Sequence, residues 1–168
     1  MTPHHPFRGR DAVAAGCLSS RQLRGSGVQR LFRGIYVDAG ATVDLALRAR
    51  AAALLKPDAV IGGYAAAELL GASCGPADAP VELIVATSTA PQAGLVLRED
   101  VLPADAIETT TDGIRVTSYL QTAFDLARTR ERLDAVIALD ALSRVGGFHP
   151  RAVVRFGYRH VGARGTAR

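Results

Sequence analysis

The chain has 168 residues, of which 48% are hydrophobic and 21% charged, a composition that fits one or two small folded domains and excludes a disordered chain. It holds neither an apolar stretch long enough to span a membrane nor the regions of a secretory signal, so we expect a cytoplasmic protein with no membrane partner. Residues 1–36 hold six arginines and one acid, residues 37–143 eight basic and fifteen acidic side chains, and residues 144–168 six arginines and no acid. Two basic ends around an acidic middle indicate a polyanionic partner.

Residues 11–25 predict two short helices. DAVAAG at residues 11–16 is a helical stretch closed by Gly16. In SSRQLRG, Ser19 is followed three residues later by Gln22, which is the spacing of a capping box. The second helix is predicted to end near Gly25.

Residues 26–37 predict one more helical segment and a hairpin. SGVQRLF at residues 26–32 places Val28 and Leu31 on one helical face. Arg33-Gly34 then forms a tight turn into the return strand Ile35–Val37. Three short helices and a hairpin are the outline of a winged helix-turn-helix.

The middle of the chain predicts a sheet packed by helices. An alanine-rich helix over Val43–Leu55 is stopped by Pro57, and AVIGGYAAAELLG gives a short strand and then a helix that ends at Gly71. PVELIVAT is the clearest strand, and further short strands follow in LVLRED, AIETTT and GIRVTS.

From Ser118 onward the hydrophobic period becomes helical. SYLQTAFDLAR and LDAVIALDALSRV predict two helices, and the second is expected to turn Leu133, Ile137 and Leu142 inward. The remaining residues are basic and contain several glycines, as in a linker.

These elements predict an α+β fold, with a small N-terminal winged helix-turn-helix followed by a mixed domain of a small, mostly antiparallel sheet packed with helices. We divide the chain into a winged-helix-like DNA-binding module at residues 1–40, an α+β domain at 41–147, and a basic tail or truncated linker at 148–168.

No catalytic residue, metal ligand or cofactor is predicted. A metal-dependent nuclease needs an acidic-x-Lys pair on a strand, but Ile84 stands two residues after Glu82, and the only lysine, Lys56, precedes a proline. The four histidines lack the spacing of zinc ligands.

DNA binding has better support from the residues. In a helix-turn-helix, basic side chains grip phosphates while a helix in the major groove reads base edges. We assign phosphate contacts to Arg21, Arg24, Arg30 and Arg33, and base-edge contacts to Gln22, Ser26 and Gln29. The alternative is a solvated arginine-rich face with no partner.

The order of FRGRDAVAAG, CLSSRQLRG, VQRLFRGIYV, VIGGYAAAELLG, PVELIV and GIRVTSYLQTAFDLAR resembles the AbiEi-like antitoxin and transcriptional-regulator proteins of actinobacteria. The last of these blocks is the most specific. The resemblance implies a winged helix followed by an antitoxin-type α+β domain, and the chain ends about where longer relatives continue into a domain like the very-short-patch-repair endonuclease. It places the DNA reader on residues 20–31 and the wing on residues 32–37.

The resemblance implies a non-enzymatic transcriptional regulator that binds double-stranded DNA at its own promoter. It also implies a type IV antitoxin that opposes a nucleotidyltransferase-like toxin functionally, without obligatory direct contact. Two other interpretations stay open at this point. In the first, the chain is the N-terminal targeting portion of a nuclease-like protein. In the second, it is an interaction domain whose acidic middle binds a protein.

Overall fold

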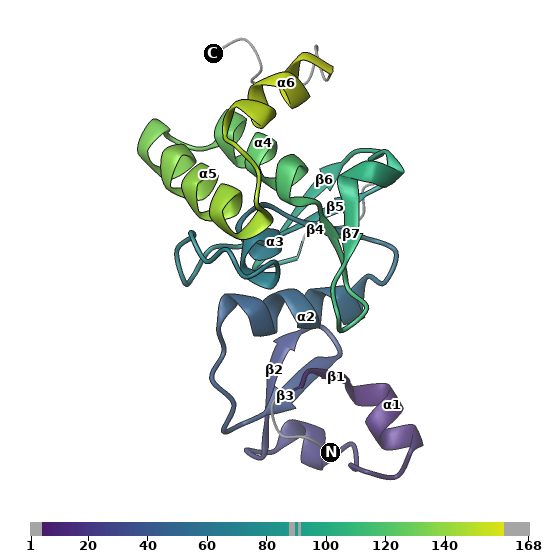
Figure 1. Cartoon of the computed structure of the whole chain (residues 1–168). Coiled ribbons are helices and arrows are strands. Elements are labelled where there is room, and N and C mark those ends of the chain that lie inside the picture. Colours follow the sequence, from purple (N-terminus) through teal and green to yellow (C-terminus); the bar gives the residue numbers. More distant parts are fainter. Residues whose placement is uncertain (1–4, 88–89, 91, 160–168) are drawn as a thin grey trace.

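The computed structural model describes residues 5–87, 90 and 92–159. The predicted α+β class is confirmed, because a three-stranded sheet and a five-stranded sheet are packed with helices. The small sheet lies on one side of helix α2, and the larger sheet with the remaining long helices lies on the other (Figure 1).

The N-terminal part consists of a small antiparallel sheet with two short helical elements inserted in it. Its elements in chain order are β1 (Phe7–Arg8), α1 (Gly9–Ala14), the 3₁₀ turn η1 (Gln22–Arg24), β2 (Val28–Phe32) and β3 (Ile35–Asp38). The strand order is β1-β3-β2. Along the chain, the helical elements therefore lie between β1 and β2, although β3 separates these two strands in the sheet.

The predicted capping box is confirmed, since Gln22 N donates to Ser19 Oγ at 3.2 Å and Ser19 N donates to Gln22 Oε1 at 2.8 Å. The Arg33-Gly34 turn and its return strand are also confirmed. The helix predicted over SGVQRLF is wrong: these residues lead into β2, which pairs with β3 from Val28 to Phe32. A segment this short fits the helical period as well as the strand period, and pairing with a neighbouring strand decides between them.

Helix α2 (Leu45–Leu55) lies between the two sheets and contacts strands of both. Asp44 caps it by accepting a hydrogen bond from Leu47 N at 2.7 Å. Its buried side chains are Leu45, Leu47, Ala49, Ala51 and Ala52. Because alanine is small, strands can approach this helix closely from both sides.

The larger sheet is built from β4 (Val60–Gly62), β5 (Val81–Val85), β6 (Leu95–Glu99), β7 (Ile107–Thr109) and β8 (Arg115–Thr117), in the order β6-β5-β4-β8-β7. The 3₁₀ turn η2 (Ala104–Ala106) precedes β7. Pairs β4–β5 and β7–β8 are antiparallel, whereas β4–β8 and β5–β6 are parallel. The sheet is thus evenly mixed rather than mostly antiparallel, because chain order does not reveal which sheet edge each strand joins.

Four helices complete the second part of the chain: α3 (Gly63–Leu69), α4 (Tyr119–Thr129), α5 (Arg132–Gly146) and α6 (Arg151–Arg159). Of the three residues expected to face inward on α5, Leu142 is buried, but Leu133 and Ile137 are 71% and 46% exposed. Helix α5 packs mainly on α4, so only one of its sides is covered.

Part of the range interpreted as a tail or linker is helical. In α6, Val153 and Phe156 are buried, and the Phe156 ring packs edge-on against Phe124 of α4 with centroids 5.6 Å apart. Residues 160–168 lie outside the described residues. The division into three segments otherwise remains a prediction.

The Asp44 cap gives a first prediction. Replacing Asp44 with alanine removes the acceptor for Leu47 N and should lower the free energy of unfolding by about 1 kcal/mol. Urea denaturation measures this, with Asp44→Asn expected to retain most of the stability and the exposed Asp78→Ala as a matched control. An Asp44→Ala variant as stable as the wild type would show that the cap contributes nothing.

Candidate nucleic-acid interface

One face of the three-stranded sheet carries α1 and η1. A side chain at Gly9 would lie 2.6 Å from Tyr36 Cε2 and 3.0 Å from Leu23 Cδ1, so Tyr36, Leu23 and the start of α1 are in close contact. Arg30 pairs with Tyr36 across the β2–β3 ladder. Because directly opposed residues point to the same face, Arg30 lies on the face that carries η1.

All four arginines assigned to phosphates are exposed, and they lie beside or within η1, on β2 and in the hairpin turn, at Arg21, Arg24, Arg30 and Arg33. Across residues 5–87, 90 and 92–159, no carboxylate forms an ion pair with any of them. The acids nearest in sequence are Asp11 and Asp38, and Asp11 pairs with Arg10 instead. These four guanidiniums therefore carry uncompensated positive charge.

Two of the three residues assigned to base edges use their amides within the fold. Gln22 Oε1 accepts from Ser19 in the capping box, and Gln29 Nε2 donates to the carbonyl of Ala41 at 3.0 Å. A bidentate contact to adenine needs both the oxygen and the nitrogen of an amide. Ser26 is exposed just before β2. Base contacts by these residues remain a prediction.

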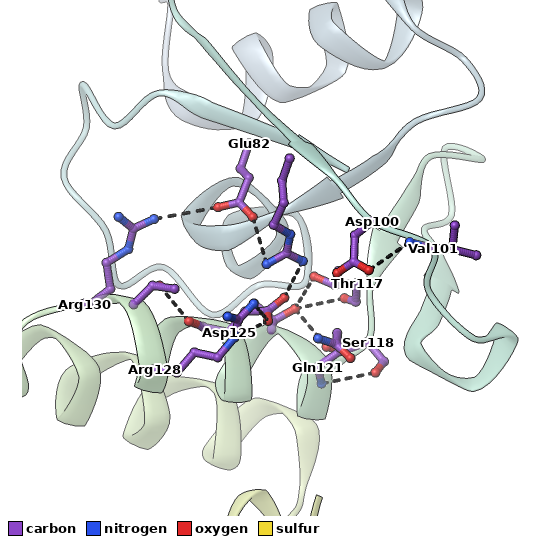
Figure 2. Close-up of polar contacts among 12 residues, drawn as sticks. Glu82, Asp100, Val101, Thr117, Ser118, Gln121, Asp125, Arg128 and Arg130 are labelled. Carbon is purple, nitrogen blue, oxygen red and sulfur yellow. Dashed lines mark hydrogen bonds and ion pairs between the residues drawn. The ribbon is translucent and has the colours of Figure 1, made fainter. Parts of the chain in front are cut away.

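A second polar arrangement, the ionic cluster, joins the larger sheet to α4 and consists of Glu82, Arg98, Asp125, Arg128 and Arg130 (Figure 2). Asp125 is 3% exposed, and each of its oxygens meets a guanidinium: Arg98 Nη2 at 2.7 Å and Arg128 Nη2 at 3.0 Å. Arg98 also reaches Glu82 Oε1 at 3.4 Å. One arginine of an edge strand thus bridges its neighbour strand and a helix.

Buried hydroxyls hold the junction between β8 and α4 beside this cluster (Figure 2). Thr122 Oγ1 lies 2.7 Å from Thr117 Oγ1 and donates to the carbonyl of Ser118 at 2.8 Å. Ser118 caps α4 by accepting from Gln121 N. The start of α4, and with it the position of Asp125, is therefore fixed by local hydrogen bonds.

The charge state of Glu82 depends on its burial. Desolvation raises the pKa of its carboxyl, and Arg98 opposes that rise while Asp125 adds to it. Glu82 Oε2 is 3.9 Å from Arg130 Nη2, and the Arg130 guanidinium lies over the Tyr64 ring, 4.8 Å from its centroid. The carboxylates are thus engaged by arginines, an arrangement that suits a brace between sheet and helix.

The sequence pattern points to Glu82 only in the test for a nuclease carboxylate, and it does not predict the ionic cluster. A local sign of this cluster in the sequence is Asp125, which lies among apolar residues of α4 and is followed three residues later by Arg128. No group of three His, Cys, Asp or Glu side chains suited to a metal ion occurs in the part of the chain that the structure describes. His4 and His160 lie outside that part.

The fold and surface define an α+β protein in which an arginine-rich module of small elements precedes an ionically braced sheet and helix body. A family model for the AbiEi antitoxin C-terminal domain matches residues 51–156, and the chain belongs to this family. No curated protein gives a significant match to the chain. Among the described residues, no helix is both long enough and apolar enough to cross a membrane.

Breaking the ionic cluster gives a second prediction. Asp125→Ala leaves Arg98 and Arg128 without their shared carboxylate and should cost about 3 kcal/mol of unfolding free energy, the low end for a buried pair, because both guanidiniums keep some solvent contact. The matched control is Asp140→Ala, whose exposed pair with Arg144 should contribute about 0.5 kcal/mol or less. Equal losses in urea denaturation would contradict a bracing role.

The pKa of Glu82 gives a third prediction. Since its pKa is raised in the folded state, the folded protein binds this proton more tightly than the unfolded chain. The resulting stabilisation is present below the unfolded pKa and is lost as pH rises through the folded pKa. The free energy of unfolding of the wild type, relative to that of Glu82→Gln, should therefore fall as pH rises. Urea denaturation from pH 4 to 8 measures this difference. A shift in the opposite direction would mean that the arginines outweigh desolvation.

Proposed function

We propose that the chain is a non-enzymatic, DNA-binding transcriptional regulator that binds double-stranded DNA at its own promoter. Membership of the AbiEi antitoxin family supports an antitoxin role. In this proposal it acts in the cytoplasm as a type IV antitoxin and opposes a nucleotidyltransferase-like toxin functionally, without direct contact.

The observation that carries DNA binding is the set of four exposed, uncompensated arginines that runs from the residue before η1 to the hairpin turn. Elsewhere Arg98 and Arg128 meet a buried carboxylate, which satisfies their charge inside the protein. Guanidiniums that face solvent with no carboxylate partner are suited to phosphate oxygens, which accept paired hydrogen bonds from them. The partner that presents phosphates in a row is nucleic acid.

We assign η1 to the recognition segment of a winged helix-turn-helix and the β2–β3 hairpin to its wing. This wing begins at Val28, four residues earlier than the sequence analysis places it. Because η1 has only three residues, few side chains can reach base edges. Phosphate contacts then supply most of the affinity, and the shape of the DNA supplies part of the selectivity.

The test is the salt dependence of DNA binding. Arg24→Ala/Arg30→Ala should weaken binding to the DNA upstream of the gene and make the slope of log K against log salt shallower by about 1.8, or about 0.9 for each lost contact. Fluorescence anisotropy measures both quantities. The control Arg132→Ala/Arg144→Ala removes the same charge from α5, which lies beyond α2 from the module, and should leave the slope unchanged (Figure 1).

Unchanged affinity and slope in Arg24→Ala/Arg30→Ala would remove these residues from the interface. The wild type is also compared on a scrambled duplex of the same length. Tighter binding to the upstream DNA supports autoregulation, whereas equal binding contradicts it.

A further inference from the structure

A hollow of about 240 Å³ opens beside the hairpin turn, between β1, the start of α1 and the end of α2. It is lined by Arg8, Arg10, Arg33, Gly34, Ile35 and Leu55. Half of these residues are arginines, and none is acidic. Arg8 and Arg10 are outside the set that the sequence analysis assigned to DNA.

Arg8 forms a fixed wall of this hollow. Its Nε and Nη2 donate to the carbonyl of Leu54, near the end of α2, at 3.1 and 2.6 Å. Its backbone position is set by pairing with Ile35 across the β1–β3 ladder. A half-buried guanidinium held at two of its nitrogens loses little further entropy when its remaining donors bind a ligand.

The other two arginines are carried by backbone that is itself tied together. Gly9 N donates to Gly34 O at 2.9 Å, which holds the start of α1, where Arg10 lies, against the turn that carries Arg33. Gly34 has a φ of 78°, a conformation that glycine adopts without strain. Arg10 pairs with Asp11, but both side chains are largely exposed, so this pair is weak and leaves the Nη atoms available.

Three arginines line this one hollow, and like charges so placed repel one another and favour an anion with several oxygens. The hollow is smaller than the roughly 300–1,000 Å³ of small-molecule sites, so it suits a single phosphate group rather than a whole nucleotide. Ile35 and Leu55 add apolar walls, which strengthen hydrogen bonds to a bound anion by excluding water.

We propose that this hollow, the phosphate hollow, binds one backbone phosphate of the DNA. This inference rests on the proposed function and extends the interface from the hairpin turn to the junction with α2. Arg8 and Arg10 are its new contacts, and Arg33 is shared with the sequence-based set.

The experiment measures the salt slope of DNA binding by fluorescence anisotropy for Arg10→Ala/Arg33→Ala. Arg8 is left in place because it also holds Leu54. The expected slope is shallower by about 1.8 than that of the wild type, while Arg132→Ala/Arg144→Ala stays at the wild-type value. Equal urea midpoints for Arg10→Ala/Arg33→Ala and the wild type confirm that the variant is folded.

A second arm titrates inorganic phosphate into the free protein and follows the arginine Nε–H signals by NMR. A slope shallower by about 1.8 supports the hollow, even where Arg24→Ala/Arg30→Ala leaves binding unchanged. A slope shallower by only about 0.9 is what the loss of Arg33 alone gives, and it overturns the hollow. An unchanged slope in Arg10→Ala/Arg33→Ala overturns the hollow, while a reduced slope in Arg24→Ala/Arg30→Ala keeps the proposed function. Phosphate-dependent shifts at these arginines without DNA binding by the wild type identify free phosphate as the ligand and overturn the DNA assignment.

Discussion

The rest of the structure depends on the two-sided burial of helix α2. Phe32 and Ile35 of the small sheet belong to the same hydrophobic core as Ala49, Ala52 and the strands of the larger sheet. A helix with large side chains on both faces would hold the two sheets apart, whereas a run of alanines lets both approach. Alanine also has the highest helix propensity, so this segment forms a helix without needing a single apolar stripe. One element therefore joins the module to the body.

The distribution of arginine charge separates the two parts of the molecule. In the body, Arg98 links β6 to Asp125 of α4, and a buried carboxylate is tolerable there only because guanidiniums neutralise it. In the module, the arginines between η1 and the hairpin turn face solvent. The same residue type thus stabilises one part and, in our proposal, binds a ligand in the other. What separates the roles is a buried carboxylate at ion-pair distance, since Asp125 is 3% exposed whereas the Asp11 carboxylate beside Arg10 faces solvent.

The contact between Arg8 and Leu54 connects the burial of α2 with the arginines of the module. It ties β1 to the carbonyl end of α2, and it also presents a guanidinium to the phosphate hollow. With a DNA phosphate in this hollow, as we propose, DNA contacts the module close to the helix that supports the antitoxin domain. The orientation of that domain relative to DNA is then set by packing on α2 rather than by a flexible linker.

Local interactions were readable from the sequence alone. The Ser19–Gln22 capping box, the Arg33-Gly34 turn, the alanine-rich helix and the strand at Val81–Val85 depend on residues close together in the chain, so spacing and propensity predict them. The exposed arginines of the candidate interface were also predicted as a set, because their density does not depend on the fold. Only the tertiary structure decided that residues 28–32 form a strand, since β2 is stabilised by pairing with β3. Likewise, Glu82, Arg98 and Asp125 come from three distant segments, and Leu133 is exposed because α5 is covered on one side only. Long-range pairing and burial are properties of the packed chain, and no local pattern encodes which segments meet.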